Sequence, residues 1–280
     1  MCSASTLRDQ HTPELITASI VGRGYCSDVY AWGDGQVLKL FHGPLGRARA
    51  EREYRATRAV HAAGLPAPAA YELLEIDNRW GVVLERINGP SLFEAVQAKP
   101  WTLFDAVRKL SELHAAIHAC AAPAELPAQR DWLANSIDAA GLSEADRRAA
   151  RSRLSELPDG STLCHGDFHP ANVLITPRGP VVIDWDTATR GHPLGDVAGT
   201  CWLLRHAELP DWSPGYMHLM LRCFRPTLLR GYLRHYLRLR PGSYREIEAW
   251  RLPLEARGAR FEPETLRKSK AEQSKAAVRI

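Results

Sequence analysis

The sequence predicts an α+β fold of two lobes: a small N-terminal lobe with an antiparallel sheet and one helix, and a larger, mainly helical C-terminal lobe. Residues 15–87 contain five strand-like runs interrupted by one helical stretch, whereas residues 91–157 read as several helices. The chain has 280 residues, of which 45% are hydrophobic and 24% charged, so it has a globular composition and can bury a sizeable core.

The N-terminal lobe is predicted to cover residues 1–87, with a hinge near residues 84–90. Its strands are expected at residues 15–21, 28–32, 36–41, 70–76 and 80–86. Residues 46–63 are rich in alanine, arginine and glutamate, and the residues that follow are helix stop signals, namely Gly64, Pro66 and Pro68. The one helix of this lobe should therefore lie between the third and fourth strands.

A glycine-rich loop is expected between the first two strands. Gly22 and Gly24 follow an apolar run and precede a strand-like segment, so this loop can form a hairpin that closes over phosphate groups. Ser27 follows at the third position of the pattern and suggests a stiffer loop with a hydroxyl facing the phosphates. Such a pattern is weak evidence when it stands alone.

Lys39 is the one charged residue inside an otherwise apolar strand. A buried ammonium group is costly unless it is paired, so Lys39 implies an anionic partner. A nucleotide phosphate together with a carboxylate on the next helix would serve. Glu53 is the expected carboxylate and Glu51 the alternative, although either glutamate could instead lie on a solvated helix face.

The C-terminal lobe is predicted to span residues 91–256. Its helices are expected to include residues 101–119, 143–157, 196–206 and segments from residue 214 onward. Ser143 is followed three residues later by an acid, which is a helix-start pattern. Residues 257–280 are expected to form a polar tail, with a frayed helix as one form.

The most informative segment is H-G-D-F-H-P-A-N at residues 165–172, followed by I-D-W-D at residues 183–186. Two short apolar runs between these motifs, separated by a proline- and glycine-rich turn, predict a hairpin. The hairpin would bring Asn172 near Asp184, with Asp167 close by. Transfer of a γ-phosphoryl group needs a group that orients the acceptor hydroxyl and oxygen ligands for magnesium, and these three residues supply them. An ordinary hairpin with polar loop residues would show the same short motif.

Together these blocks resemble the superfamily of aminoglycoside phosphotransferases and choline kinases, which are small-molecule kinases with a protein-kinase-like fold. The matching blocks occur in order: the glycine-rich loop, the strand lysine, the helix glutamate followed by G-L-P-A-P, the H-G-D-x-H-P-x-N loop and I-D-W-D. A further match is G-H-P-L-G-D-V-A at residues 191–198, which looks like the G-x-P-x-x-D-x-A segment of this superfamily. The resemblance therefore extends over most of the chain.

The resemblance implies a role for each matching residue. Asp167 would be the catalytic base toward the acceptor hydroxyl. Asn172 and Asp184 would bind Mg²⁺, and Lys39 would hold the α- and β-phosphates of ATP while pairing with Glu53. The reaction implied is transfer of the γ-phosphoryl group to a hydroxyl of an antibiotic such as an aminoglycoside, or of a hydroxylated metabolite.

The resemblance also implies where the base of the nucleotide binds. Residues 84–87 would form the hinge, in which backbone groups of Glu85 and Ile87 hydrogen-bond the adenine. GTP is an alternative to ATP. The oligomeric state does not follow from the sequence.

Several other residues near these motifs have weaker expected roles. Asp196 should anchor, from a helix start, the loop at residues 165–172 that carries Asp167, called the catalytic loop. His165 should hold that loop by hydrogen bonds. His114 is expected to be a hydrogen-bonded core histidine rather than a ligand. His169 and Asp186 lie close to the site without an assigned catalytic role. We expect Trp185 to pack beneath the loop at residues 183–186 that carries Asp184, called the metal loop, and Cys26 to be a passive residue of the glycine-rich loop.

Other classes of protein are disfavoured. The sequence has no apolar run of the roughly 18 residues that would span a bilayer and no secretory signal, so the protein is expected in the cytoplasm and not in a membrane. Six cysteines without metal-ligand spacing indicate reduced thiols. A protein kinase is disfavoured because no A-P-E segment follows Asp184. A catalytically silent nucleotide-binding protein is disfavoured because all four expected site residues are present, namely Lys39, Asp167, Asn172 and Asp184.

The acceptor is the least defined part of the prediction. The formal net charge is +4, and arginines recur every four residues at Arg230, Arg234 and Arg238, which on a helix form one basic stripe. No aromatic interleaving or nucleic-acid motif accompanies the stripe, so a solvated face is favoured over a nucleic-acid site. Acids are sparse in residues 200–260, which weakens an aminoglycoside as the acceptor, because a polycation calls for an acidic pocket.

Overall fold

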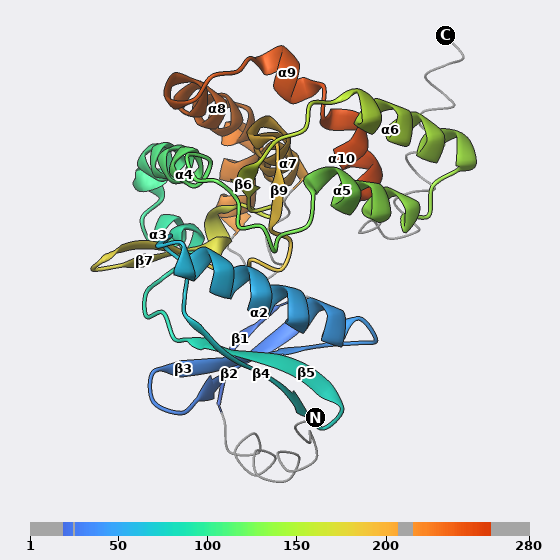
Figure 1. The fold of residues 1–280 in the computed structure, drawn as a ribbon. Helices are drawn as coiled ribbons and strands as arrows, with labels where there is room; N and C mark the ends of the chain where they lie inside the picture. Colours follow the sequence, from blue (N-terminus) through green and yellow to red (C-terminus); the bar gives the residue numbers. More distant parts are fainter. Residues whose placement is uncertain (1–18, 25, 207–214, 259–280) are drawn as a thin grey trace.

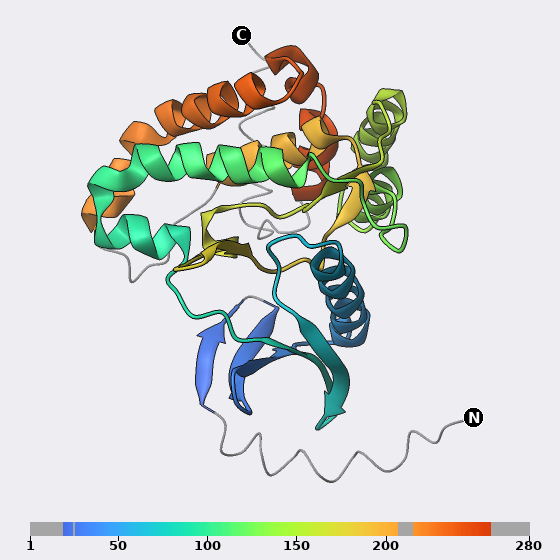
Figure 2. The ribbon, with the colours of Figure 1, turned by 60° about the vertical axis from the view of Figure 1, so that its left-hand side comes forward.

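The computed structural model describes residues 19–24, 26–206 and 215–258 (Figure 1). A small lobe built on a sheet lies below a larger helical lobe, and the chain passes between them after the last strand of the sheet (Figures 1 and 2). The predicted α+β fold of two lobes is confirmed.

The small lobe contains a five-stranded antiparallel sheet in the order β1-β2-β3-β5-β4. Its strands are β1 (Ile20–Arg23), β2 (Ser27–Trp32), β3 (Gln36–Phe41), β4 (Ala70–Ile76) and β5 (Arg79–Glu85). Helix α2 (Gly46–Ala62) lies across one face of the sheet (Figure 1). The first strand was expected at residues 15–21; of these, residues 15–18 lie outside the described part of the chain.

The two faces of β3 explain why one lysine can stand inside this strand. Side chains alternate between faces along a strand. Leu38 and Leu40 pack into a cluster on the face away from α2, whereas Phe41 packs against Ala50 of α2. Lys39 shares the face of Phe41 by this alternation, so its side chain is directed toward the helix.

The large lobe consists of helices around a core that includes the fully buried rings of Trp185, Tyr232 and Tyr236. Its helices are α3 (Leu92–Ala98), α4 (Leu103–Ile117), α5 (Gln129–Asp138), α6 (Glu144–Glu156), α7 (Pro193–His206), α8 (Gly215–Leu239), α9 (Tyr244–Glu248) and α10 (Arg251–Gly258). Helices α4 and α8 run side by side (Figure 2). Among the described residues, no helix is long and apolar enough to cross a membrane.

Two short antiparallel strand pairs carry the loops of the site. They are β6 (Thr162–Cys164) with β9 (Thr189–Gly191), and β7 (Val173–Thr176) with β8 (Gly179–Val182). The second pair is the hairpin expected from the sequence.

Some boundaries differ from those expected. Helix α7 begins at Pro193 instead of Asp196, since proline fits the first turn of a helix. Of the residues expected to form the polar tail, Arg257 and Gly258 are the last two residues of α10, whose Leu254 packs in the core. Residues 259–280 lie outside the described part. The stripe residues Arg230, Arg234 and Arg238 are exposed on α8.

Candidate active site

Lys39 pairs with one carboxylate of its own lobe, Glu53, and with one of the large lobe, Asp184. Its Nζ lies 2.7 Å from Oδ1 of Asp184 and 3.2 Å from Oε2 of Glu53. Burial alone would lower the pKa of Lys39, but Asp184 and Glu53 outweigh burial and hold this pKa above its ordinary value. Burial raises the pKa of Glu53 to about 7 despite the nearby ammonium group. Of the two carboxylates, Asp184 lies closer to Lys39.

The structure also chooses between the two candidate glutamates of α2. Glu53 is 1% exposed and faces the sheet. Glu51 points outward and pairs with Arg47 and Arg55 on the same helix. Glu53 is thus the carboxylate beside Lys39.

The hairpin of β7 and β8 places the two expected metal ligands near each other. Val173 pairs with Val182, and the backbone N–H of Ile183 donates to the carbonyl of Asn172 at 3.0 Å. Asp184, the next residue, has a φ of 68°, a left-handed conformation that is uncommon outside glycine and marks a constrained loop. The side-chain amide of Asn172 donates to the backbone carbonyl of Asp167 at 3.0 Å. Asp167, Asn172 and Asp184 are brought together.

The loop that carries Asp167 is held from several sides. The ring of His165 is buried, and its Nε2 lies 3.1 Å from the carbonyl oxygen of Ile183. The backbone N–H of Asp167 donates a hydrogen bond to Nδ1 of the same ring. Gly166 has a φ of 82°, and a Cβ on it would lie 2.5 Å from the carbonyl oxygen of Thr187, so only glycine fits there. His165 holds the loop as expected.

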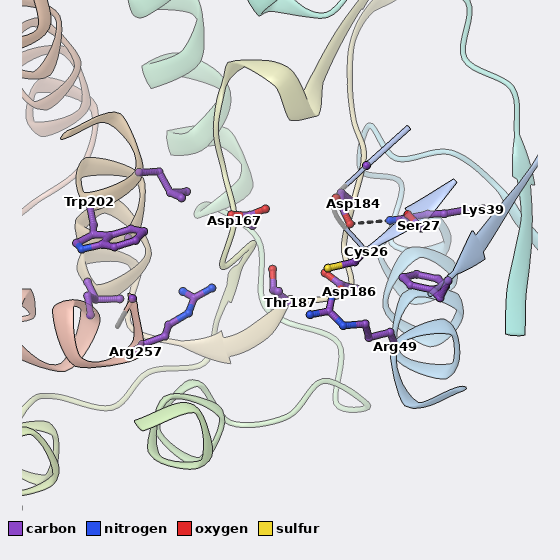
Figure 3. Close-up of a pocket in the computed structure, with 16 residues that line it drawn as sticks. Cys26, Ser27, Lys39, Arg49, Asp167, Asp184, Asp186, Thr187, Trp202 and Arg257 are labelled. Atoms are coloured by element: carbon purple, nitrogen blue, oxygen red, sulfur yellow. Dashed lines mark hydrogen bonds and ion pairs between the residues drawn. The ribbon is translucent and has the colours of Figure 1, made fainter. Parts of the chain in front are cut away.

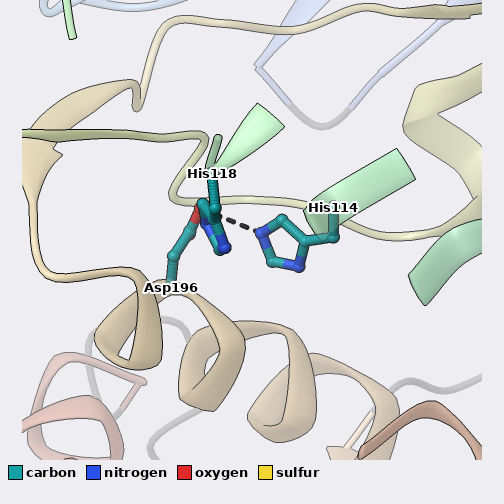
Figure 4. Close-up of side chains that lie close together, drawn as sticks. All are labelled: His114, His118 and Asp196. Atoms are coloured by element: carbon teal, nitrogen blue, oxygen red, sulfur yellow. Dashed lines mark hydrogen bonds and ion pairs between the residues drawn. The ribbon is translucent and has the colours of Figure 1, made fainter. Parts of the chain in front are cut away.

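Asp196 at the start of α7 anchors the same loop. Asp196 is 3% exposed, and its carboxylate accepts hydrogen bonds from the N–H groups of His165 at 2.6 Å and Gly166 at 2.8 Å. The Nε2 atoms of His114 and His118 lie 3.1 and 3.2 Å from its Oδ2 (Figure 4). These hydrogen bonds hold the pKa of Asp196 well below its ordinary value, against the effect of burial.

The two histidines of this cluster have partners on α8. Nδ1 of His114 is 2.6 Å from the hydroxyl of Tyr232, and Nδ1 of His118 is 2.6 Å from that of Tyr236. Both nitrogens of each ring are thus hydrogen-bonded, as expected of a core histidine. His114, His118 and Asp196 have a geometry that could hold a metal ion, but hydrogen bonds already satisfy their ligand atoms.

A cavity of about 350 Å³ lies between the lobes (Figure 3). Its walls on the side of the sheet include Gly24, Ser27 and Lys39, and Asp167 lies across from them. The N–H of Gly24 donates to the carbonyl of Ser27 at 2.8 Å, which closes the turn between β1 and β2. Gly22 lies in β1 opposite Val29. Cys26 also lines the cavity.

Asp167 faces this cavity as a carboxylate. Burial opposes its ionisation, but the nearby imidazole of His169 and the charge of Arg257 hold the pKa of Asp167 below its ordinary value. His169 Nε2 lies 3.6 Å from Oδ2 of Asp167. A carboxylate in this state can accept a hydrogen bond from a hydroxyl at neutral pH.

The electrostatics of the site suit a divalent cation. Glu53, Asp184 and Asp186 each offer a carboxylate oxygen, and these atoms lie within 4.8 Å of one another. Burial and the nearby Asp184 raise the pKa of Asp186, although Arg49 lies 3.4 Å from it. A cation bound at Asp184 would relieve this accumulation of negative charge, and carboxylate and amide oxygens are ligands that magnesium accepts.

The hinge residues lie at the end of β5. The backbone N–H of Glu85 donates a hydrogen bond to the carbonyl of Ala69 at 2.8 Å. The backbone N–H of Arg86 donates one to the carbonyl of Gly35 at 2.9 Å. The carboxylate of Glu85 accepts from the N–H of Ala69. Ile87 follows, half-buried, where the chain leaves the small lobe. Glu85 and Ile87 thus lie at the junction of the lobes.

Two features of the site were not expected from the sequence. Arg257 reaches from α10 into the cavity, where its Nη1 donates to the carbonyl of Gly166 at 3.2 Å (Figure 3). His118 joins the Asp196 cluster. Only the second had a sequence signal, because His114 and His118 share the four-residue spacing of Tyr232 and Tyr236 and so lie on one helix face.

The fold and the site together define a phosphotransferase of the protein-kinase-like fold. The defining features are the two lobes, the buried Lys39 beside Asp184, and the anchored loop that carries Asp167. The sequence model of the phosphotransferase enzyme family matches residues 17–250. The chain therefore belongs to this family, and the prediction of a phosphotransferase is confirmed.

Solved structures agree with this fold. The aminoglycoside-3'-phosphotransferase of type VIII shares 19% identity at a TM-score of 0.59, over 89% of this chain and 99% of that chain. The amicoumacin kinase hAmiN, solved with AMP-PNP, Ca²⁺ and Ami, shares 14% identity at a TM-score of 0.59. The match covers 87% of this chain and 79% of that chain. The streptomycin-ATP-APH(2")-IIa ternary complex shares 15% identity at a TM-score of 0.58, over 97% and 96%.

Two curated proteins also match. Acyl-CoA dehydrogenase family member 11 of Gallus gallus is 29% identical over 192 residues, which are 59% of this chain and 25% of that protein. Acyl-CoA dehydrogenase family member 10 of Mus musculus is 26% identical over 174 residues, which are 54% of this chain and 16% of that protein. The match thus spans a quarter or less of the length of these relatives.

Proposed function

We propose that this protein is an ATP- and Mg²⁺-dependent kinase that transfers the γ-phosphoryl group to a hydroxyl of a small molecule. The observation that carries the proposal is the cavity between the lobes, with Lys39 and Asp184 on one side and the ionised Asp167 on the other. Nucleotide phosphates would lie against the first pair and the acceptor hydroxyl against Asp167.

Each residue would act through the group it presents. Asp167 would orient the acceptor hydroxyl and take its proton as the new O–P bond forms and the bond from the γ-phosphorus to the leaving oxygen of ADP breaks. Lys39, held by Glu53, would bind the α- and β-phosphates. Asn172 and Asp184 would hold magnesium, which when bound supplies positive charge to the phosphates.

The loop and the hinge would bind the remainder of the nucleotide. Gly22 and Gly24 allow the loop between β1 and β2 to approach the phosphates closely, with the hydroxyl of Ser27 nearby. Glu85 and Ile87, at the junction of the lobes, would offer backbone groups to the adenine. The nucleotides named for the related structures are ATP and AMP-PNP, which supports a nucleoside triphosphate as the phosphoryl donor.

The proposal is tested by product formation and by two variants. Mass spectrometry of reactions with ATP, Mg²⁺ and a panel of aminoglycosides, macrolides, amino alcohols and sugars should detect a product heavier by one phosphoryl group. Asp167→Asn and Asp184→Ala should each abolish product formation and also the slow hydrolysis of ATP. Thermal melting should show that both variants are folded. Asp159→Asn, at an exposed carboxylate, is the matched control. Unchanged turnover in both active-site variants would sink the proposal.

The alternatives give different results in the same assays. A catalytically silent nucleotide-binding protein would bind ATP without Mg²⁺-dependent hydrolysis or product. A protein kinase would phosphorylate serine- or threonine-containing peptides and none of the small molecules. Substituting GTP for ATP in the productive reaction determines which nucleotide is preferred.

A further inference from the structure

A second cavity, of about 160 Å³, lies beside the active-site cavity. Residues from both lobes line it: Arg49, Arg52, Trp132, Asn135, Ser136, Asp186, Thr187 and Arg257. Four of these also line the active-site cavity, namely Arg49, Asp186, Thr187 and Arg257. The two cavities therefore adjoin, and a molecule bound with its hydroxyl at Asp167 can extend into the second one.

Positive charge dominates this side cavity. Three arginines face one carboxylate, and Arg49 already pairs with that carboxylate, Asp186, at 3.4 Å. Within the described ranges, Arg52 takes part in none of the ion pairs. Among the described residues, the guanidinium groups of Arg52 and Arg257 form no ion pair, although the charge of Arg52 acts on Asp186 and that of Arg257 on Asp167.

Arg257 is held in place next to the reacting groups. Its guanidinium lies 4.2 Å from the ring of Trp132, and Nη1 donates to the carbonyl of Gly166, the residue before Asp167. A guanidinium has five N–H donors in a planar fork that suits a carboxylate or phosphate. Figure 3 shows this group directed into the cavity near Asp167 and Thr187. An oxyanion held here would lie a short distance from the acceptor hydroxyl.

We propose that the side cavity lined by Arg49, Arg52 and Arg257 binds an oxyanion of the acceptor, so that the acceptor is an anionic hydroxylated molecule and not a polycation. This inference rests on the proposed function. Beside Arg257, the wall of the active-site cavity is apolar, with Trp202, Leu203 and Leu254. An acceptor with an apolar or aromatic middle, a hydroxyl at Asp167 and an oxyanion at the arginines fits both cavities.

A polycationic acceptor fits this arrangement poorly. The carboxylates that line the two cavities within the described residues are Asp167, Asp184 and Asp186. Each lies in the catalytic loop or the metal loop, and Asp184 and Asp186 already face Lys39 and Arg49. The ammonium groups of a polycation would instead meet Arg257.

The test uses four ligands with one skeleton. Each ligand is a benzene ring with one hydroxymethyl group. At the para position the four ligands carry a carboxylate, a phosphorylated hydroxymethyl group, a second hydroxymethyl group or an aminomethyl group. Dissociation constants are measured by calorimetry with AMP-PNP and Mg²⁺ present, and kcat/KM is measured with ATP. The carboxylate or the phosphate should bind at least about tenfold more tightly than the amine. The first two ligands distinguish a carboxylate-bearing acceptor from a phosphorylated one.

Two variants locate the oxyanion. Arg52→Gln, at an exposed position on α2, and Arg257→Met should each weaken binding of the anionic ligand by about tenfold relative to the diol. Arg55→Gln is the matched control, since Arg55 is exposed on the same helix and outside both cavities. It should leave all four dissociation constants unchanged.

Three results would overturn the inference. The amine could bind as tightly as the anions, or both arginine variants could keep the wild-type selectivity. Alternatively, the variants could weaken AMP-PNP binding alone, which would assign the arginines to the nucleotide. Each of these leaves Mg²⁺-dependent phosphorylation of a hydroxyl intact, whereas the proposed function fails only if ATP turnover and product are absent.

Discussion

Replacing Asp196 by asparagine should loosen the loop that carries Asp167. The carboxylate accepts one hydrogen bond at Oδ1, from Gly166, and three at Oδ2, from His165, His114 and His118. An asparagine can keep its oxygen at the Oδ2 position only by turning its NH₂ group toward the N–H of Gly166. Two buried donors then face each other, and the other three hydrogen bonds lose the charge of their acceptor.

The cost follows from these contacts. Each buried unsatisfied donor costs about 1–3 kcal/mol, and a hydrogen bond to a neutral acceptor is weaker than one to a charged acceptor by about 1 kcal/mol. Relief from burying the charge offsets part of the sum. We expect a net loss of about 4 kcal/mol, which is a large share of the roughly 5–15 kcal/mol of a typical protein. Displacement of Asp167 should also lower kcat by at least about tenfold.

Urea unfolding followed by circular dichroism measures the first effect, and steady-state turnover measures the second. Asp159→Asn is the control. The side chain of Asp159 is 73% exposed and pairs with Arg130, so its replacement should cost less than about 1 kcal/mol. An Asp196→Asn variant that unfolds at the wild-type urea concentration with wild-type kcat would refute this account of the loop.

Two further perturbations test the same region. Burial and the neighbouring His118 lower the pKa of His114 to about 3. The unfolded chain then binds a proton at pH values where the folded protein does not, so this histidine should reduce stability by about 1.4 kcal/mol per unit as the pH falls from about 6.5 toward 3. Between pH 7 and 5, the urea midpoint of His114→Gln should depend less on pH than that of the wild-type protein. An equal dependence would contradict a lowered pKa of His114. Gly166→Ala should cost about 1–3 kcal/mol and lower kcat, because its Cβ would meet the Thr187 carbonyl at 2.5 Å. Gly35→Ala, with a φ of 70° and open space around the Cβ, should reduce stability alone, and a similar kcat in the two variants would exclude a clash at Gly166.

Local patterns predicted much of the fold. Strands expected at residues 28–32 and 36–41 occur as Ser27–Trp32 and Gln36–Phe41. Ser143 caps α6 by accepting a hydrogen bond from the N–H of Asp146 at 3.1 Å, as its spacing indicated. Alternation, turn residues and caps act over a few residues, so the sequence alone carries them.

The pairing of Lys39 shows where local reasoning stops. An isolated lysine in an apolar strand implied an anionic partner, and two glutamates on the next helix were available. Glu53 is buried and Glu51 is not, because the packing of α2 on the sheet sets which helix face points inward. The partner from the other lobe, Asp184, lies 145 residues away in the chain.

By itself, the sequence determined the two-lobed fold, the family and the groups available for phosphoryl transfer, since motifs and periodicity are properties of short segments. Only the tertiary structure placed Arg257 beside Gly166, at a separation of 91 residues, and joined His118 to Asp196. Contacts of this kind depend on how whole helices dock, and no short segment encodes a docking geometry. The side cavity lined by Arg49, Arg52 and Arg257 is built from such contacts, which is why its charge is evident only in the folded chain.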